Sequence, residues 1–137
     1  MSAAVALDTS VAVPLLLASH PSHRAAARWL GARRAALSGH ALAETYSVLT
    51  RLPGDARAAP ADVARALEAS FEPPLVLRAA TARRLPLTLA RLGVTGGAVY
   101  DALVAFAARE NRLTLATRDA RALSTYALVG VDVALLG

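Results

Sequence analysis

The chain has 137 residues, with 15 basic and 10 acidic side chains and a formal net charge of +5. A chain of this length buries roughly two-thirds of its surface when it folds, and its 55% hydrophobic content excludes intrinsic disorder. The absence of cysteine excludes a disulfide scaffold, thiolate zinc sites and cysteine nucleophiles. We therefore expect residues 1–137 to form a single domain with one core.

The chain alternates between short apolar runs and helical segments. The pattern predicts strands over 3–7, 35–37, 75–77, 113–116 and 131–135. It predicts helices over 11–18, 21–30, 38–52, 60–70, 81–92 and 95–109, the last one capped by Thr95, and a short helix from Asp119 to about residue 126. This alternation implies right-handed crossovers and an α/β fold, with a parallel sheet covered by helices on both faces.

Every basic residue is an arginine, because the chain contains no lysine. This excludes P-loop nucleotide binding and Schiff-base catalysis, both of which need a lysine amine. No apolar run is long enough to cross a membrane, and the start of the chain lacks the basic region of a signal peptide, so we expect a cytoplasmic protein. The positive charge is compatible with a nucleic-acid partner, and equally with a basic surface that has no such partner.

Two aspartates follow predicted strands. Asp8 comes directly after the strand over 3–7, and Asp119 comes shortly after the strand over 113–116. In parallel sheets, ligands bind beyond the carboxyl ends of the strands, at the point where strand order reverses. Each aspartate could instead cap a helix, although Thr9 and Ser10 could cap the first helix without burying a charge. The pair favours a functional site at one edge of the sheet.

Asp101 and Glu44 are the other acids in unusual positions. Asp101 is the only charge between residues 96 and 108, in a helix so apolar that it should be buried on most sides. A partly buried aspartate needs a polar partner, and a metal ion is one such partner. The structural alternatives are that Asp101 faces the surface or that it pairs with an arginine. Glu44 lies at the edge of an apolar helix face, where an ordinary exposed glutamate is also common.

These four acids form a candidate site that contains only oxygen ligands. The three histidines lie in loops or at helix starts, and no G-x-S-x-G motif occurs, so a zinc site and a nucleophilic triad are not indicated. Carboxylate sites select Mg²⁺ or Mn²⁺ over zinc. Two such ions, about 3.5–4 Å apart, are a common arrangement for phosphodiester hydrolysis.

Around these acids the chain resembles PIN domains, and more narrowly the VapC-type toxins of prokaryotic toxin–antitoxin pairs. The matching segments are LDTSV with Asp8, LAETYSVLTRLP with Glu44, and YDALVAFAARENRLTLATRD with Asp101 and Asp119. The order and approximate spacing of all four acids match, and the similarity covers nearly the whole chain. Each motif alone is loose, whereas the ordered set is fairly specific.

The resemblance implies a compact three-layer α/β/α sandwich, a homodimer and an endoribonuclease that depends on Mg²⁺ or Mn²⁺. The four acids would hold the metal, and the hydroxyls of Thr9 and Thr117 would assist near the metal or the phosphate. It also implies inhibition by a cognate antitoxin protein. For the RNA backbone, we expect contacts from arginines on helix ends or polar faces, namely Arg33, Arg34, Arg83, Arg84 and Arg91.

Two other functions stay open from the sequence. One is a catalytically silent PIN-like module that only binds RNA or a protein. The intact acid set argues against it, because a silent module has no reason to keep buried charges that repel one another. The other is a phosphatase or receiver fold, which is disfavoured by the lack of lysine and of a second aspartate two residues after Asp8.

Overall fold

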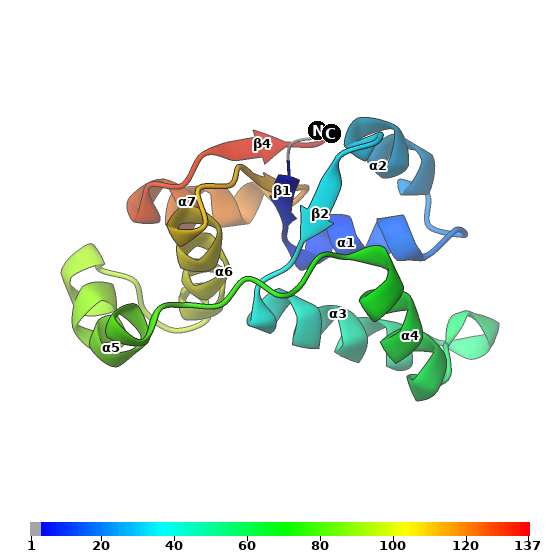
Figure 1. Ribbon diagram of the computed structural model, residues 1–137, viewed down its shortest axis with the longest axis horizontal. Coiled ribbons are helices and arrows are strands. Elements are labelled where there is room, and N and C mark those ends of the chain that lie inside the picture. Colours follow the sequence, from blue (N-terminus) through cyan, green and yellow to red (C-terminus); the bar gives the residue numbers. More distant parts are fainter. Residues whose placement is uncertain (1–3) are drawn as a thin grey trace.

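A four-stranded parallel sheet forms the centre of the computed structural model, which describes residues 4–137 (Figure 1). The spatial order of the strands is β2-β1-β3-β4, and all neighbours run parallel. From β1 the chain moves outward to β2 and later returns to β3 on the other side of β1, so strand order reverses at β1. The predicted α/β fold with a parallel sheet is confirmed. The strands are β1 (Ala4–Leu7), β2 (Arg34–Ala36), β3 (Leu115–Thr117) and β4 (Val133–Leu135).

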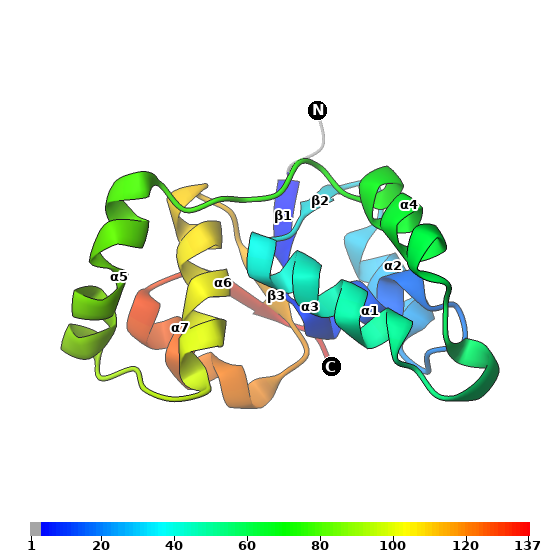
Figure 2. The same cartoon turned by 90° about the horizontal axis from the view of Figure 1, so that it is seen from below.

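Helices connect and cover these strands. Right-handed crossovers that leave the sheet in opposite directions lie on opposite faces, so the β1–β2 and β3–β4 connections cover different faces. Both views place α5, α6 and α7 on one side of β1 and β2, and α1, α2 and α4 on the other (Figures 1 and 2). In the described part of the chain, no helix is both long and apolar enough to span a bilayer. The helices are α1 (Thr9–Leu16), α2 (His23–Leu30), α3 (Gly39–Thr50), α4 (Pro60–Ser70), α5 (Ala79–Leu92), α6 (Ala98–Glu110) and α7 (Leu123–Val129).

The inner strands are buried because helices cover the sheet. Leu7 in β1 and Leu115 in β3 are completely inaccessible to solvent. Helix α6 packs against the main core through a run of mostly small side chains, which lets the helix lie close to its neighbours. A smaller apolar cluster joins α1, α3 and α4. Its buried members are Val13, Leu49, Val63 and Leu67.

Most predicted elements are found within a few residues of their expected ends. The predicted strand over 75–77 is wrong, because only Leu75 pairs with the sheet, through an isolated parallel bridge to Ser38. The two prolines before it offer no N–H groups for a sheet ladder, and Leu75 N donates to Leu37 O at 2.8 Å. Ala3, the expected first residue of the first strand, lies outside the described residues.

Two predicted helix starts also differ. Thr95 does not cap α6, which begins at Ala98 after a turn in which Gly96 has φ of +59°. A positive φ ends any helical path through that residue, so the helix starts later than the apolar pattern suggests. The first helix is capped by Asp8 itself, whose side chain accepts a hydrogen bond from Ser10 N, and not by Thr9 or Ser10.

Candidate active site

The four acids lie around one cavity of about 240 Å³ at the carboxyl ends of β1 and β3. Asp8 follows β1, and Asp119 is the second residue after β3. Asp101 lies in the first turn of α6, and Glu44 in the middle of α3. The cavity therefore occupies the place where strand order reverses, which is where such sheets bind ligands. The structure brings the acids together, and their catalytic role stays a prediction.

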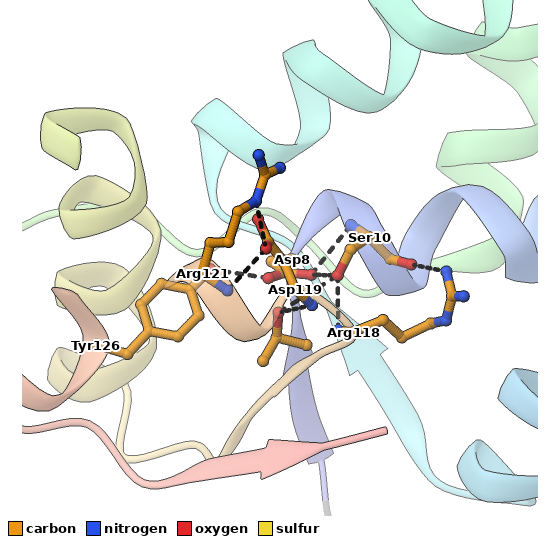
Figure 3. A network of polar contacts seen from close by, with 7 residues as sticks. Asp8, Ser10, Arg118, Asp119, Arg121 and Tyr126 are labelled. Atoms are coloured by element: carbon orange, nitrogen blue, oxygen red, sulfur yellow. Dashed lines mark hydrogen bonds and ion pairs between the residues drawn. The ribbon is translucent and has the colours of Figure 1, made fainter. Parts of the chain in front are cut away.

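Asp8 is held in one position by hydrogen bonds to both of its carboxylate oxygens (Figure 3). Its Oδ1 accepts from Ser10 N at 3.0 Å and from Ser10 Oγ. Its Oδ2 accepts from the hydroxyl of Tyr126 at 2.8 Å. Only 6% of the residue is exposed, so these bonds supply the polar partners that a buried carboxylate requires. The side chain of Asp8 therefore both caps α1 and lines the candidate site.

Ser10, which lines the cavity, and Thr117 link the start of α1 to the end of β3. Ser10 Oγ accepts from Arg118 N at 2.7 Å and lies 3.3 Å from Thr117 Oγ1. Thr117 is fully buried, and its Oγ1 accepts from Asp119 N at 3.0 Å. Thr117 thus holds the backbone that carries Asp119 and does not line the cavity. Thr9, by contrast, lines the cavity wall, as a residue close to a bound phosphate would.

The charges of the four acids act on one another most clearly at Asp101. Burial raises the pKa of the Asp101 carboxyl, and the negative charges of Asp119, Asp8 and Glu44 raise it further. The imidazole of His40 opposes this increase. His40 Nε2 lies 3.5 Å from Glu44 Oε2 at the more open side of the cavity. Repulsion of this kind is expected where carboxylates converge to bind a cation.

The roles of Ser10 and Tyr126 are not evident from the sequence. There, Ser10 stands out only as a possible helix cap, and Tyr126 only as the end of a short helix. One signal for Tyr126 exists, because a tyrosine within a buried segment needs a partner for its hydroxyl group. The identity of that partner cannot be read locally, since Asp8 is 118 residues away in the chain.

The donor set at the cavity matches a hard divalent cation. All four acids present carboxylate oxygens, which Mg²⁺ and Mn²⁺ prefer. Across residues 4–137, however, no three acidic or histidine side chains are arranged so that they could hold a metal ion without moving. The side chains of Glu44 and Asp119 are 49% and 34% exposed, so the cavity is open to solvent at these two acids.

Two arginines expected to contact RNA have partners within the protein. The guanidinium of Arg33 stacks 4.0 Å above the ring of Trp29. Arg34 forms an ion pair with Glu72 at 2.8 Å. The other three of these arginines lie on α5, with no ion pair to another described residue. Of the five arginines expected to contact RNA, the three on α5 therefore stay without such a partner in the described part of the chain, whereas Arg33 and Arg34 do not.

Known proteins share this fold and this chain's sequence pattern. The PIN domain model matches residues 5–128. The chain is 59% identical over 133 residues to Ribonuclease VapC27 of Mycobacterium tuberculosis, with 97% of each chain covered. It resembles the structure of VapBC2 from Rickettsia felis bound to a promoter DNA fragment, with a TM-score of 0.67, 17% identity, and 98% and 99% of the two chains covered. It also resembles VapBC-5 of M. tuberculosis, a member of the VapBC family of toxin–antitoxin systems, with a TM-score of 0.60, 22% identity and 98% of each chain covered.

Proposed function

The chain belongs to the PIN-domain family, and we propose that it is a metal-dependent endoribonuclease that acts as the toxin of a toxin–antitoxin pair. The observation that carries this proposal is the convergence of Asp8, Glu44, Asp101 and Asp119 at the reversal point of a parallel sheet. The high identity to a protein named a ribonuclease, over nearly the full length of both chains, supports it. In this proposal residues 1–137 form a single PIN-like domain.

In this function the four acids would hold Mg²⁺ or Mn²⁺. When bound, such an ion supplies a water molecule of lowered pKa and stabilises the charge that develops on the phosphate and on the leaving oxygen. Asp8 accepts more hydrogen bonds than the other three acids, from Ser10 N, Ser10 Oγ and the Tyr126 hydroxyl. Such outer partners orient a metal ligand and support its affinity.

Neither hydroxyl that touches Asp8 is suited to act as a base or a nucleophile. The pKa of Tyr126 is raised far above its ordinary value by burial and by the charge of Asp8, so the phenol keeps its proton at Oη. Ser10 Oγ directs its proton to Asp8 Oδ1. Their role is to position Asp8. Thr9 lines the cavity wall, and in this function its hydroxyl would donate to a phosphate oxygen.

The partners follow from the same proposal. The substrate is RNA, and the inhibitor is a small cognate antitoxin whose arginine would pair with the acids of the cavity. We also propose a homodimer and a cytoplasmic location. Co-purification with the product of the neighbouring gene, and light scattering of the isolated chain, test the two assemblies separately.

The function is tested by incubating purified protein with total RNA in Mg²⁺, in Mn²⁺ and in EDTA. We expect cleavage with either ion and none with EDTA. Asp101→Asn should reduce cleavage by at least about 100-fold, because the change removes a ligand charge with little change of shape. Asp132→Asn is the matched control, since Asp132 is exposed and precedes β4 at the other edge of the sheet. Activity that persists in EDTA would overturn the metal mechanism. Binding without any cleavage would favour the silent RNA-binding module.

A further inference from the structure

A second polar cavity, of about 470 Å³, lies between α5 and the C-terminal end of α6, the two helices at one side of the molecule (Figure 2). One stripe of α5 contributes Thr81, Arg84 and Thr88, which are spaced so that they share one helix face. The end of α6 and the residues that follow it contribute Arg109 and Arg112. Arg78 lines the cavity just before the start of α5.

We call this second cavity the arginine cavity. It contains one carboxylate, that of Glu110, which already has hydrogen-bond partners within the protein. The Glu110 side chain is only 9% exposed, and its Oε2 accepts from Arg78 N at 2.9 Å. Burial alone would raise the pKa of Glu110, but hydrogen bonds from Thr81 and Arg78 and the charges of Arg78 and Arg109 outweigh burial and lower it. Glu110 therefore stays ionised and offsets one of the four arginine charges. The four arginines and Glu110 together give the cavity a net charge of 4 − 1 = +3, which is more than half of the chain's formal net charge of +5.

Two of the four arginines have no role inside the protein. Arg109 donates to Val129 O at 3.1 Å and so ties α6 to α7, and Arg78 lies 3.7 Å from Glu110. Within residues 4–137, the guanidinium groups of Arg84 and Arg112 form neither a hydrogen bond nor an ion pair. Both residues are exposed, and both line the cavity.

The backbone at Arg112 is a second, independent observation. Arg112 has φ of +56°, and it is the one residue other than glycine with a positive φ among the described residues. The helices α2, α5 and α7 each end at a glycine with positive φ. A side chain in this conformation costs free energy that glycine avoids. Arg112 therefore carries a backbone cost that the glycines at the ends of these three helices avoid.

The arginine cavity and the four acids lie at opposite ends of α6. Helix α6 carries Asp101 in its first turn and Arg109 in its last, which separates them by about 12 Å along the helix axis. The acidic cavity repels phosphate unless cations are present, so a nucleic-acid strand needs positive charge elsewhere on the surface. Guanidinium and threonine hydroxyl groups are common donors to phosphate oxygens.

We propose that the arginine cavity binds backbone phosphates of the single-stranded RNA substrate, a few nucleotides from the bond that is cut. This proposal rests on the proposed ribonuclease function and adds a subsite to it. Arg84 and Arg112 would contact phosphate directly, while Arg78 and Arg109 would keep the cavity open and positive.

The test measures binding of a fluorescein-labelled single-stranded RNA of 12 nucleotides, in EDTA, across a series of salt concentrations. The variant is Arg84→Gln combined with Arg112→Gln. The matched control is Arg24→Gln combined with Arg28→Gln, which removes the same charge from two exposed positions of α2, on the other side of the sheet. Melting curves verify that both variants fold. Cleavage of the same RNA by the wild type in Mg²⁺ is measured in parallel.

We expect the variant with both Arg84→Gln and Arg112→Gln to bind about tenfold more weakly at low salt. Its log–log salt slope should fall in magnitude by about 0.7 for each phosphate that the variant no longer neutralises. The control should bind nearly as the wild type does. Equal weakening in both variants, or none in either, would overturn the subsite. If the wild type still cleaves in Mg²⁺ in those cases, the proposed function stands without the subsite. Displacement of the RNA by poly-glutamate of equal charge at equal concentration would overturn the assignment to nucleic acid.

Discussion

Tyr126 donates a hydrogen bond from its hydroxyl to Asp8 Oδ2 at 2.8 Å and thereby joins α7 to the end of β1 (Figure 3). Both residues are buried, with 1% and 6% exposed. A hydrogen bond between a buried hydroxyl and a buried carboxylate is among the stronger kinds. The first and last parts of the domain are therefore coupled through a residue of the candidate site.

Replacing Tyr126 with phenylalanine tests this coupling. The change removes the donor to Asp8 with little loss of volume, so the free energy of unfolding should fall by about 1–3 kcal/mol. Urea denaturation measures this loss. Tyr46→Phe is the control, because Tyr46 is 38% exposed and its hydroxyl has no hydrogen-bond partner among the described residues. Equal stability of the two variants would show that the bond contributes nothing.

We predict that Ser10→Ala weakens catalysis, although the change removes only one oxygen atom. Ser10 Oγ contacts Asp8, Thr117 and the backbone of Arg118, so its removal loosens both strand ends at once. Loss of such an outer partner typically lowers metal affinity or activity by about 10–100-fold. The measurement is cleavage as a function of Mg²⁺ concentration, with the exposed Ser124→Ala as control. Wild-type dependence on Mg²⁺ in Ser10→Ala would contradict a positioning role.

Asp8→Asn separates the capping role of Asp8 from its role in the site. Asparagine caps helices nearly as well as aspartate, so α1 should persist and the circular dichroism spectrum should be unchanged. RNA cleavage should fall on the order of 100-fold or more, because a neutral amide is a poor ligand for a hard cation. Retention of most of the activity would reduce Asp8 to a helix cap.

Asp101→Asn should leave the metal-free protein as stable as the wild type or more stable. The folded-state pKa of Asp101 is raised, so the proton contributes stability below the unfolded-state value of 3.8. That contribution is lost as the pH rises through the folded-state value, and charged Asp101 then strains the site at neutral pH. Asparagine does not ionise, so the variant avoids this cost. Melting temperatures in EDTA should therefore differ most near neutral pH, and the difference should diminish as the solution is acidified.

The same Asp101→Asn variant should lose most of the stabilisation that Mg²⁺ gives the wild type, since that effect follows the ratio of ion concentration to dissociation constant. A variant that is clearly less stable than wild type in EDTA, at neutral pH, would indicate that Asp101 has a structural partner. No ion pair of Asp101 is found among the described residues.

The sequence by itself was sufficient to predict the parallel α/β fold and the four acids. Strand-ending aspartates such as Asp8 and Asp119 can be recognised locally, because the carboxyl ends of parallel strands must meet at one edge of the sheet. Asp101 was noticeable as a lone charge in an apolar helix. The prediction of a strand over 75–77 was wrong because it used the local pattern alone. A short apolar run has the pattern of a strand whether or not its residues pair with the sheet.

Only the tertiary structure decided which side chains hold these acids and which charges meet elsewhere. The bond from Tyr126 to Asp8 joins residues 118 positions apart, and the link from Ser10 to the backbone of Arg118 joins residues 108 apart. The arginine cavity likewise forms only where a stripe of α5 faces the end of α6. Helix and strand patterns depend on neighbours within a turn or two, whereas these contacts depend on how whole elements pack. Packing is set by the summed burial of many side chains, and no short segment carries that information.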